Sequence, residues 1–146
     1  MEILQSAHSG LRWIVLVLLL VAIVRAFARK NGNLYEKSDK MINLFTMVSL
    51  HIQLLLGLIL YIMNIGVKIR FEGFMANDQS RILGMEHPLL MLIGITLITI
   101  GRSKAEKKIA DPRKKHATIA LWFTIGLLLI LAGIPWPFRN IGTGWF

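Results

Sequence analysis

Apolar residues in this chain gather into four long runs that short polar segments separate. Each run approaches the ~20 residues that an α-helix needs to cross a bilayer. Short connections make consecutive helices antiparallel neighbours. The pattern therefore predicts an all-α membrane protein, a single domain over residues 1–146. Its four transmembrane helices should form an up-down-up-down bundle, with bounds of about 3–28, 39–64, 82–102 and 112–134.

The composition agrees with a chain that lies in lipid. Hydrophobic residues make up 55% of the 146 residues, more than the ~45–50% that is typical of soluble domains. No basic residues precede the apolar part of the first run, and no A-x-A-like cleavage site follows it. We therefore expect a retained helix rather than a cleaved signal peptide.

The positive charge is concentrated in two of the polar segments. The net charge is +9, and twelve of the 17 Lys and Arg residues lie within residues 25–40 and 102–115. Cytoplasmic loops of membrane proteins collect Lys and Arg in this way. The charge thus indicates topology rather than a nucleic-acid partner. It predicts these two segments in the cytoplasm and both termini on the other side of the membrane.

Each apolar run carries one histidine, and the chain has no cysteine. A helix rises 1.5 Å per residue, so depth can be counted from the nearest basic residue at the cytoplasmic edge. The count places His8 at about 26 Å and His87 at about 23 Å. The first and third helices of an up-down bundle lie diagonally, so both rings can point into its centre. Two facing imidazoles suit the axial positions of haem iron.

The other two histidines leave alternatives open. His51 lies at about 17 Å and His116 close to the edge. They form a second pair if the bilayer edge on the second helix lies near Asn43 and if Arg113, Lys114 and Lys115 extend to the interface from within the fourth helix. His51 with His87 is a third option, with a depth mismatch of about 6 Å. Each histidine also has a plain interpretation, as an interfacial residue or as a buried side chain with a polar partner.

Two further residues fit a bound cofactor. Arg12 follows His8 by one turn on the same helix face, and a charge inside a span needs a partner or a water-filled cavity. A haem propionate or an anionic quinone group would supply that partner, as would Glu2 or Glu86. Gly94 lies two turns after His87 on the same face. A glycine there would let a flat macrocycle approach the helix backbone.

Three short segments carry a family resemblance: HSGLRW at residues 8–13, LHIQLLLG at 50–57 and MEHP at 85–88. They resemble the small four-helix bacterial membrane proteins known as cytochrome b. The resemblance implies one or two haem b groups with two histidine ligands each. It also implies electron transfer within or across the bacterial inner membrane, with a quinone or another redox protein as partner. The ligands would come from His8, His51, His87 and His116.

Two rival hypotheses belong to other classes. In the first, the protein is a haem-free module that binds or transports copper or zinc through His8, Glu86 and His87. In the second, it is a structural subunit of a larger membrane complex or a homo-oligomer. All four histidines would then be replaceable without loss of assembly.

Overall fold

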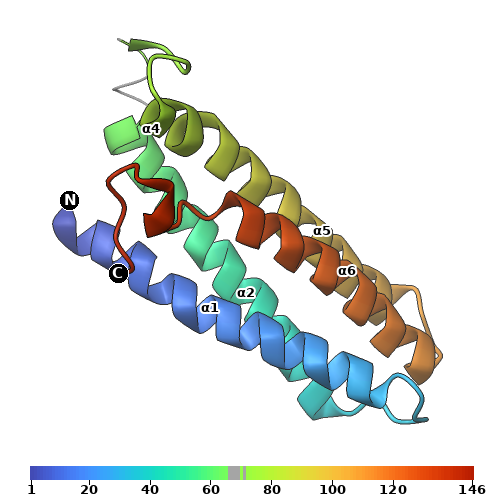
Figure 1. Cartoon of the computed structure of the whole chain (residues 1–146). Coiled ribbons are helices and arrows are strands. Elements are labelled where there is room, and N and C mark those ends of the chain that lie inside the picture. Colours follow the sequence, from blue (N-terminus) through green and yellow to red (C-terminus); the bar gives the residue numbers. More distant parts are fainter. Residues whose placement is uncertain (66–69, 71) are drawn as a thin grey trace.

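Four long helices packed side by side make up the protein, seen here in a computed structural model (Figure 1). The structure describes residues 1–65, 70 and 72–146. Among these described residues, four continuous helical stretches are long and apolar enough to cross a membrane: Glu2–Arg29, Lys37–Ile65, Asp78–Lys107 and Pro112–Gly133. Within them the elements are α1 (Glu2–Arg29), α2 (Lys37–Leu60), the π-helical turn η1 (Tyr61–Ile65), α4 (Asp78–Arg81), the π-helical turn η2 (Ile82–Glu86), α5 (His87–Lys107) and α6 (Pro112–Gly133).

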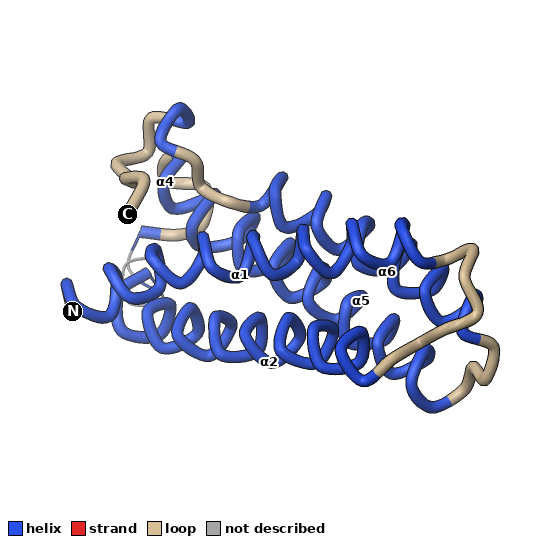
Figure 2. Tube along the Cα trace, turned by 90° about the horizontal axis from the view of Figure 1, so that it is seen from below, coloured by secondary structure: helices blue, strands red, loops and turns tan. Residues whose placement is uncertain are grey.

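The helices are arranged up-down-up-down. α1 packs against α2 and α6, and α5 packs against the same two helices, so that α1 and α5 lie diagonally. Figures 1 and 2 show the α1–α2 and α5–α6 connections together at one end of the bundle. We call this the basic end, and we call the opposite end, where both termini lie, the terminal end. The predicted fold class is confirmed, and so are the four spans, although the third span begins at Asp78 and continues to Lys107.

Local sequence explains where two of the helices begin. Asp111 accepts a hydrogen bond from the Arg113 N–H at 3.0 Å, and Pro112 occupies the first helical position, where a missing N–H costs nothing. At the start of α2, Glu36 and Asp39 form a capping box in which each side chain accepts from the other residue's backbone N–H. Both caps lie at the basic end and fix where the two connections stop.

The closest helix contact is the one between α5 and α6, and glycines make it. A Cβ on Gly94 would lie 3.1 Å from the Gly126 carbonyl oxygen and 3.0 Å from the Ile130 side chain. Small residues let two membrane helices approach backbone to backbone. Gly94 therefore faces α6. The prediction that Gly94 makes room for a macrocycle is wrong, because a neighbouring helix occupies that face.

α2 is the least buried of the four spans. Only 11% of its apolar window is buried, against 28% to 39% in the other three. Its buried residues are Asp39, Asn43, Thr46 and Leu50, all in the half nearest the basic end. Residues 51–65, all of them described, are half-buried or exposed. α2 thus packs tightly at the basic end and loosely toward the terminal end.

Candidate functional site

His8 and His87 lie next to each other near the terminal end. Their ring centres are 6.3 Å apart, and the ring planes are nearly perpendicular, at 89°. One ring comes from α1 and the other from α5, the diagonal partners of the bundle. The structure thus brings together the two histidines that the depth count places at the same level. We call these two residues the histidine pair.

The His87 ring is fixed by α6. Its Nδ1 lies 2.9 Å from the carbonyl oxygen of Gly133. A carbonyl only accepts, so Nδ1 carries the proton and Nε2 keeps its lone pair. Gly133 is the last residue of α6, and a Cβ there would lie 2.7 Å from the Leu90 Cβ. The absence of that side chain lets the end of α6 reach the start of α5.

The His8 ring is bordered by α2. Gln53 Nε2 donates to the His8 backbone carbonyl at 2.8 Å. A Cβ on Gly57 would lie 3.0 Å from His8 Cε1, so the ring packs against a residue without a side chain. His8 Nδ1 and Gln53 Oε1 are both buried, and neither has a hydrogen-bond partner among the described residues. Buried polar atoms are normally paired, so these two atoms need an explanation.

Two π-helical turns flank the histidine pair. η2 ends at Glu86, directly before His87, and η1 follows α2. The Tyr61 hydroxyl in η1 donates to the Gly84 carbonyl in η2 at 3.0 Å. π-helical turns within α-helices are frequent at functional sites. Sequence reasoning did not predict them, because no residue pattern in the chain distinguishes a π turn from an α turn.

Arg12 is held by the C-terminal segment. Its Nη2 donates to the Trp145 carbonyl at 2.6 Å. Its guanidinium lies over the rings of Trp13, at 5.4 Å, and Trp136, at 5.9 Å. The partners of Arg12 among the described residues are thus aromatic rings and a carbonyl, not Glu2 or Glu86. Its Nε is buried without a hydrogen-bond partner in the part of the chain that the structure describes, one turn from His8.

Glu86 is engaged by two arginines. It accepts from Arg81 Nε at 3.1 Å and from Arg139 Nη2 at 3.0 Å. Among the described residues, no group of three or more His, Cys, Asp and Glu is placed to hold a metal ion. The three-residue copper or zinc site expected from His8, Glu86 and His87 is therefore not assembled.

His51 has a partner of its own. Its Nε2 lies 2.9 Å from Thr99 Oγ1. The Thr99 hydroxyl donates to the Ile95 carbonyl, so His51 Nε2 is the donor in the shared bond. Thr99 follows His87 by twelve residues on α5, which is about 18 Å along the helix. His51 and His87 therefore cannot share one metal ion, and that option for the ligand pair is wrong.

His116 lies at the basic end. It is 1% exposed, its Nε2 bonds the Leu34 carbonyl at 2.8 Å, and it lies 3.9 Å from Asp39 Oδ2. Asp39 precedes His51 by twelve residues on α2, about 18 Å along the helix. The predicted second pair, His51 with His116, is therefore wrong as well.

The surroundings of His116 form a closed polar network. Asp39, 2% exposed, binds Arg25 at 2.6 Å and Arg29 at 3.5 Å. The Tyr35 ring packs 5.0 Å from the His116 ring, and its hydroxyl donates to Glu106. Burial, and then this bond to Glu106, raise the pKa of Tyr35, so that it stays protonated. We call these residues the basic-end cluster: Arg25, Arg29, Tyr35, Asp39, Glu106 and His116.

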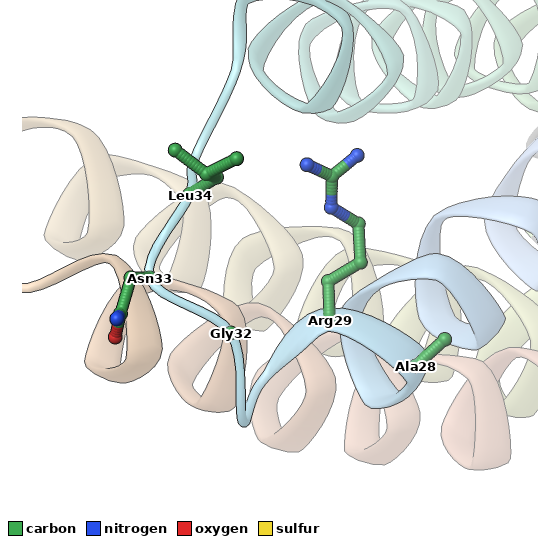
Figure 3. Close-up of a pocket in the computed structure, with 5 residues that line it drawn as sticks. All are labelled: Ala28, Arg29, Gly32, Asn33 and Leu34. Atoms are coloured by element: carbon green, nitrogen blue, oxygen red, sulfur yellow. The ribbon is translucent and has the colours of Figure 1, made fainter.

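Two surface cavities are described, and neither is lined by a histidine. The first, of about 240 Å³, lies in the turn after α1 (Figure 3). Its one charged residue, Arg29, is already paired with Glu36 at 3.2 Å. The second, of about 310 Å³, lies between α1 and α6 and has an entirely apolar lining that includes Trp13 and Trp136. The histidine pair therefore lies outside both of these cavities.

Comparison with protein-family models, with curated proteins and with solved structures finds no match for this chain. The fold and the site nevertheless define a class. It is a multi-pass membrane protein of four antiparallel helices that brings two histidines together between diagonal helices.

Proposed function

We propose that this protein is a b-type cytochrome that holds one haem b between His8 and His87 and relays electrons within or across the membrane. The observation that carries the proposal is the 6.3 Å between the two ring centres. Two imidazoles bound to one metal ion through bonds of about 2 Å have ring centres about 6 Å apart. The rings also come from opposite sides of the bundle, as axial ligands do.

The hydrogen bond of His87 supports a role as ligand. Its Nδ1–H donates to the Gly133 carbonyl at 2.9 Å. Metal-binding histidines almost always donate their second ring N–H to a carbonyl, a carboxylate or water, which fixes the tautomer and makes the ligand more basic. The free lone pair of His87 is therefore on Nε2, the nitrogen that would bind the iron.

The number of ligands favours haem over a bare metal ion. Copper and zinc sites in proteins usually need three or four side-chain ligands, and Glu86 is occupied by Arg81 and Arg139. Two imidazoles from the protein would be enough to hold haem iron, because the macrocycle supplies the other ligands. Haem supplies an iron that cycles between two oxidation states. With both axial positions filled by histidine, that chemistry is electron transfer.

The surroundings of the pair fit an amphipathic cofactor. α2 packs loosely beside the pair, and Gly57 leaves no side chain at the His8 ring. Gln53 Oε1 and Arg12 Nε are buried polar atoms without hydrogen-bond partners among the described residues. Arg12 is the residue we propose for a propionate, and its charge would raise the reduction potential. One haem is proposed rather than two, because His51 and His116 have other partners.

An optical spectrum of the detergent-purified protein, with and without dithionite, tests the proposal. We expect one haem b per chain and the sharp reduced bands of six-coordinate iron. His8→Ala and His87→Ala should each change these bands, whereas the matched variants His51→Ala and His116→Ala should leave them unchanged. A purified chain that is colourless and takes up no added haemin would show that the proposal is wrong.

A further inference from the structure

The two histidines of the pair are held very differently. The His87 ring is bonded to Gly133 at 2.9 Å, on the closely packed α5–α6 contact. The His8 ring has no such anchor: Nδ1 is buried without a partner among the described residues. The bond from Gln53 goes to the His8 backbone and does not hold the ring.

The helix segment that carries His8 is also weakly packed. In α1, all of which the structure describes, the first buried residue is Val15. Six of the seven residues before His8 are exposed. Helix ends with few buried apolar contacts open at a much lower free energy than the core does. His8 thus lies on the part of α1 that is easiest to displace.

A glycine adds to this weakness. Gly10 is inside α1, two residues after His8, and a Cβ there would have no neighbour within 4 Å. Packing therefore does not require a glycine at this position. Glycine in a helix interior costs about 1 kcal/mol relative to alanine. The first turns of α1 are consequently less stable than they would be with an alanine at position 10.

From this asymmetry we infer that His8 is an exchangeable ligand, and that the site takes a small diatomic gas in its place while His87 stays bound. The inference rests on the proposed function. In the exchange, the bond from His8 Nε2 to the iron of a bound haem would break, and the lone pair of the diatomic molecule would form a bond to the same iron. No electron or proton is transferred. Gln53 Oε1, the buried acceptor beside His8, can then accept from the displaced ring's Nδ1–H.

Carbon monoxide is the probe for this exchange. It is mixed with the dithionite-reduced full-length protein in detergent, and the Soret band is followed in time. We expect binding at a rate that stops rising with carbon monoxide concentration, because departure of His8 limits it. His8→Ala should keep its haem and bind carbon monoxide in proportion to concentration. His87→Ala should lose most of its haem, because His8 alone is weakly held.

A matched pair of helix variants tests the origin of the exchange. Gly10→Ala should slow carbon monoxide binding about fivefold, since it restores about 1 kcal/mol of helix stability. Ala7→Gly changes an exposed position one residue before His8. It should accelerate carbon monoxide binding by a similar factor. Neither substitution touches the haem ligands, so the spectrum before mixing should not change.

The outcomes separate the inference from the proposed function. A chain without haem overturns both. A chain with haem that binds no carbon monoxide keeps the proposed function and overturns the inference. The same holds if His87→Ala retains haem as well as His8→Ala does, or if Gly10→Ala and Ala7→Gly leave the binding rate at the wild-type value.

Discussion

Each end of this bundle contains histidines with buried polar neighbours. The two ends differ in whether these buried polar atoms have hydrogen-bond partners. At the basic end, His116 and Asp39 are almost fully buried, and both bond to neighbours. At the terminal end, His8, Arg12 and Gln53 each have a buried polar atom without a hydrogen-bond partner among the described residues. A satisfied polar network rigidifies a fold, whereas buried unpaired atoms are costly and need a reason.

This difference distinguishes a histidine that supports the fold from a histidine that is a candidate ligand. His116 closes the connection between α1 and α2 by holding the Leu34 carbonyl, so its role is structural. His87 also binds a carbonyl, but its ring centre lies 6.3 Å from that of a second imidazole, His8. A histidine with one ring nitrogen bonded to a carbonyl and a second imidazole beside it is a candidate ligand. The basic-end cluster should therefore control stability, and the histidine pair should control cofactor binding.

Removing the carboxylate of the basic-end cluster should have the largest effect on stability. Asp39→Ala leaves Arg25, Arg29 and His116 without their shared partner. Breaking a buried ion pair costs about 3–5 kcal/mol. Because both arginines are partly exposed, we expect a loss of about 3 kcal/mol in the free energy of unfolding. Unfolding in detergent, followed by circular dichroism, measures it.

Asp78 provides the control for this prediction. It is 74% exposed and binds Arg81 at 3.2 Å, so Asp78→Ala should cost less than about 1 kcal/mol. The haem spectrum should be the same in both variants. If Asp39→Ala abolished haem binding while the chain remained folded, the two ends would not be independent, and the comparison between them would fail.

Two glycines in the α5–α6 contact allow a sharper comparison. Substituting either one should destabilise the fold to a similar extent, but only one substitution should weaken haem binding. A Cβ on Gly101 would lie 2.3 Å from the Trp122 Cβ, and one on Gly133 would lie 2.7 Å from the Leu90 Cβ. Overpacking of this kind costs about 1–3 kcal/mol at either position. Only Gly133→Ala also displaces the carbonyl that holds His87.

Titration of the refolded or haem-depleted protein with haemin distinguishes the two variants. Loss of an outer-shell partner typically weakens metal binding by about 10–100-fold. We therefore expect at least a tenfold weaker affinity in Gly133→Ala and an affinity within about twofold of wild type in Gly101→Ala. Equal losses in both variants would mean that general packing, rather than the hydrogen bond to His87, governs haem affinity.

The parts of this molecule that sequence predicts well are those that depend on local properties. Apolar run length gives the spans, and the constant helical rise gives the depths of His8 and His87. The partners of His51 and His116 were not predictable in that way. One is the hydroxyl of Thr99 and the other is the carbonyl of Leu34. A backbone carbonyl leaves no trace in a residue pattern, and every position in a chain has one.

The glycine spacing around Gly94 was a sequence signal for helix packing, and it was misinterpreted as room for a cofactor. Gly94 and Gly101 are seven residues apart on α5, and Gly126 and Gly133 have the same spacing on α6. A repeat of seven places all the glycines of a helix on one face. Small residues repeated on the faces of two neighbouring helices are typical of close packing in membranes. The depth count itself places His116 close to the bilayer edge, and the structure has it at the basic end, bonded to the Leu34 carbonyl. What was wrong is the shift of the assumed edge toward Asn43 that a pair with His51 required.

The smallest predicted effect concerns charge, and it compares two arginines on the same helix. Arg12 follows His8 by one turn, whereas Arg25 follows it by seventeen residues, about 26 Å along α1. A positive charge near the iron favours the reduced state. Arg12→Gln should therefore lower the midpoint potential by on the order of 50 mV. Arg25→Gln should lower it at least about threefold less, because Arg25 is distant and paired with Asp39.

Spectroelectrochemical titration of the two variants measures both shifts. Arg12→Lys is the charge-conserving control. Its midpoint potential should stay close to the wild-type value, even though it loses the guanidinium contacts with the Trp145 carbonyl and the aromatic rings. If Arg12→Lys and Arg12→Gln shift the potential equally, the contacts of the Arg12 guanidinium with Trp13, Trp136 and Trp145, rather than its charge, set the potential. If Arg25→Gln shifts it as much as Arg12→Gln, the haem does not lie at the terminal end. The assignment of the site to His8 and His87 would then be wrong.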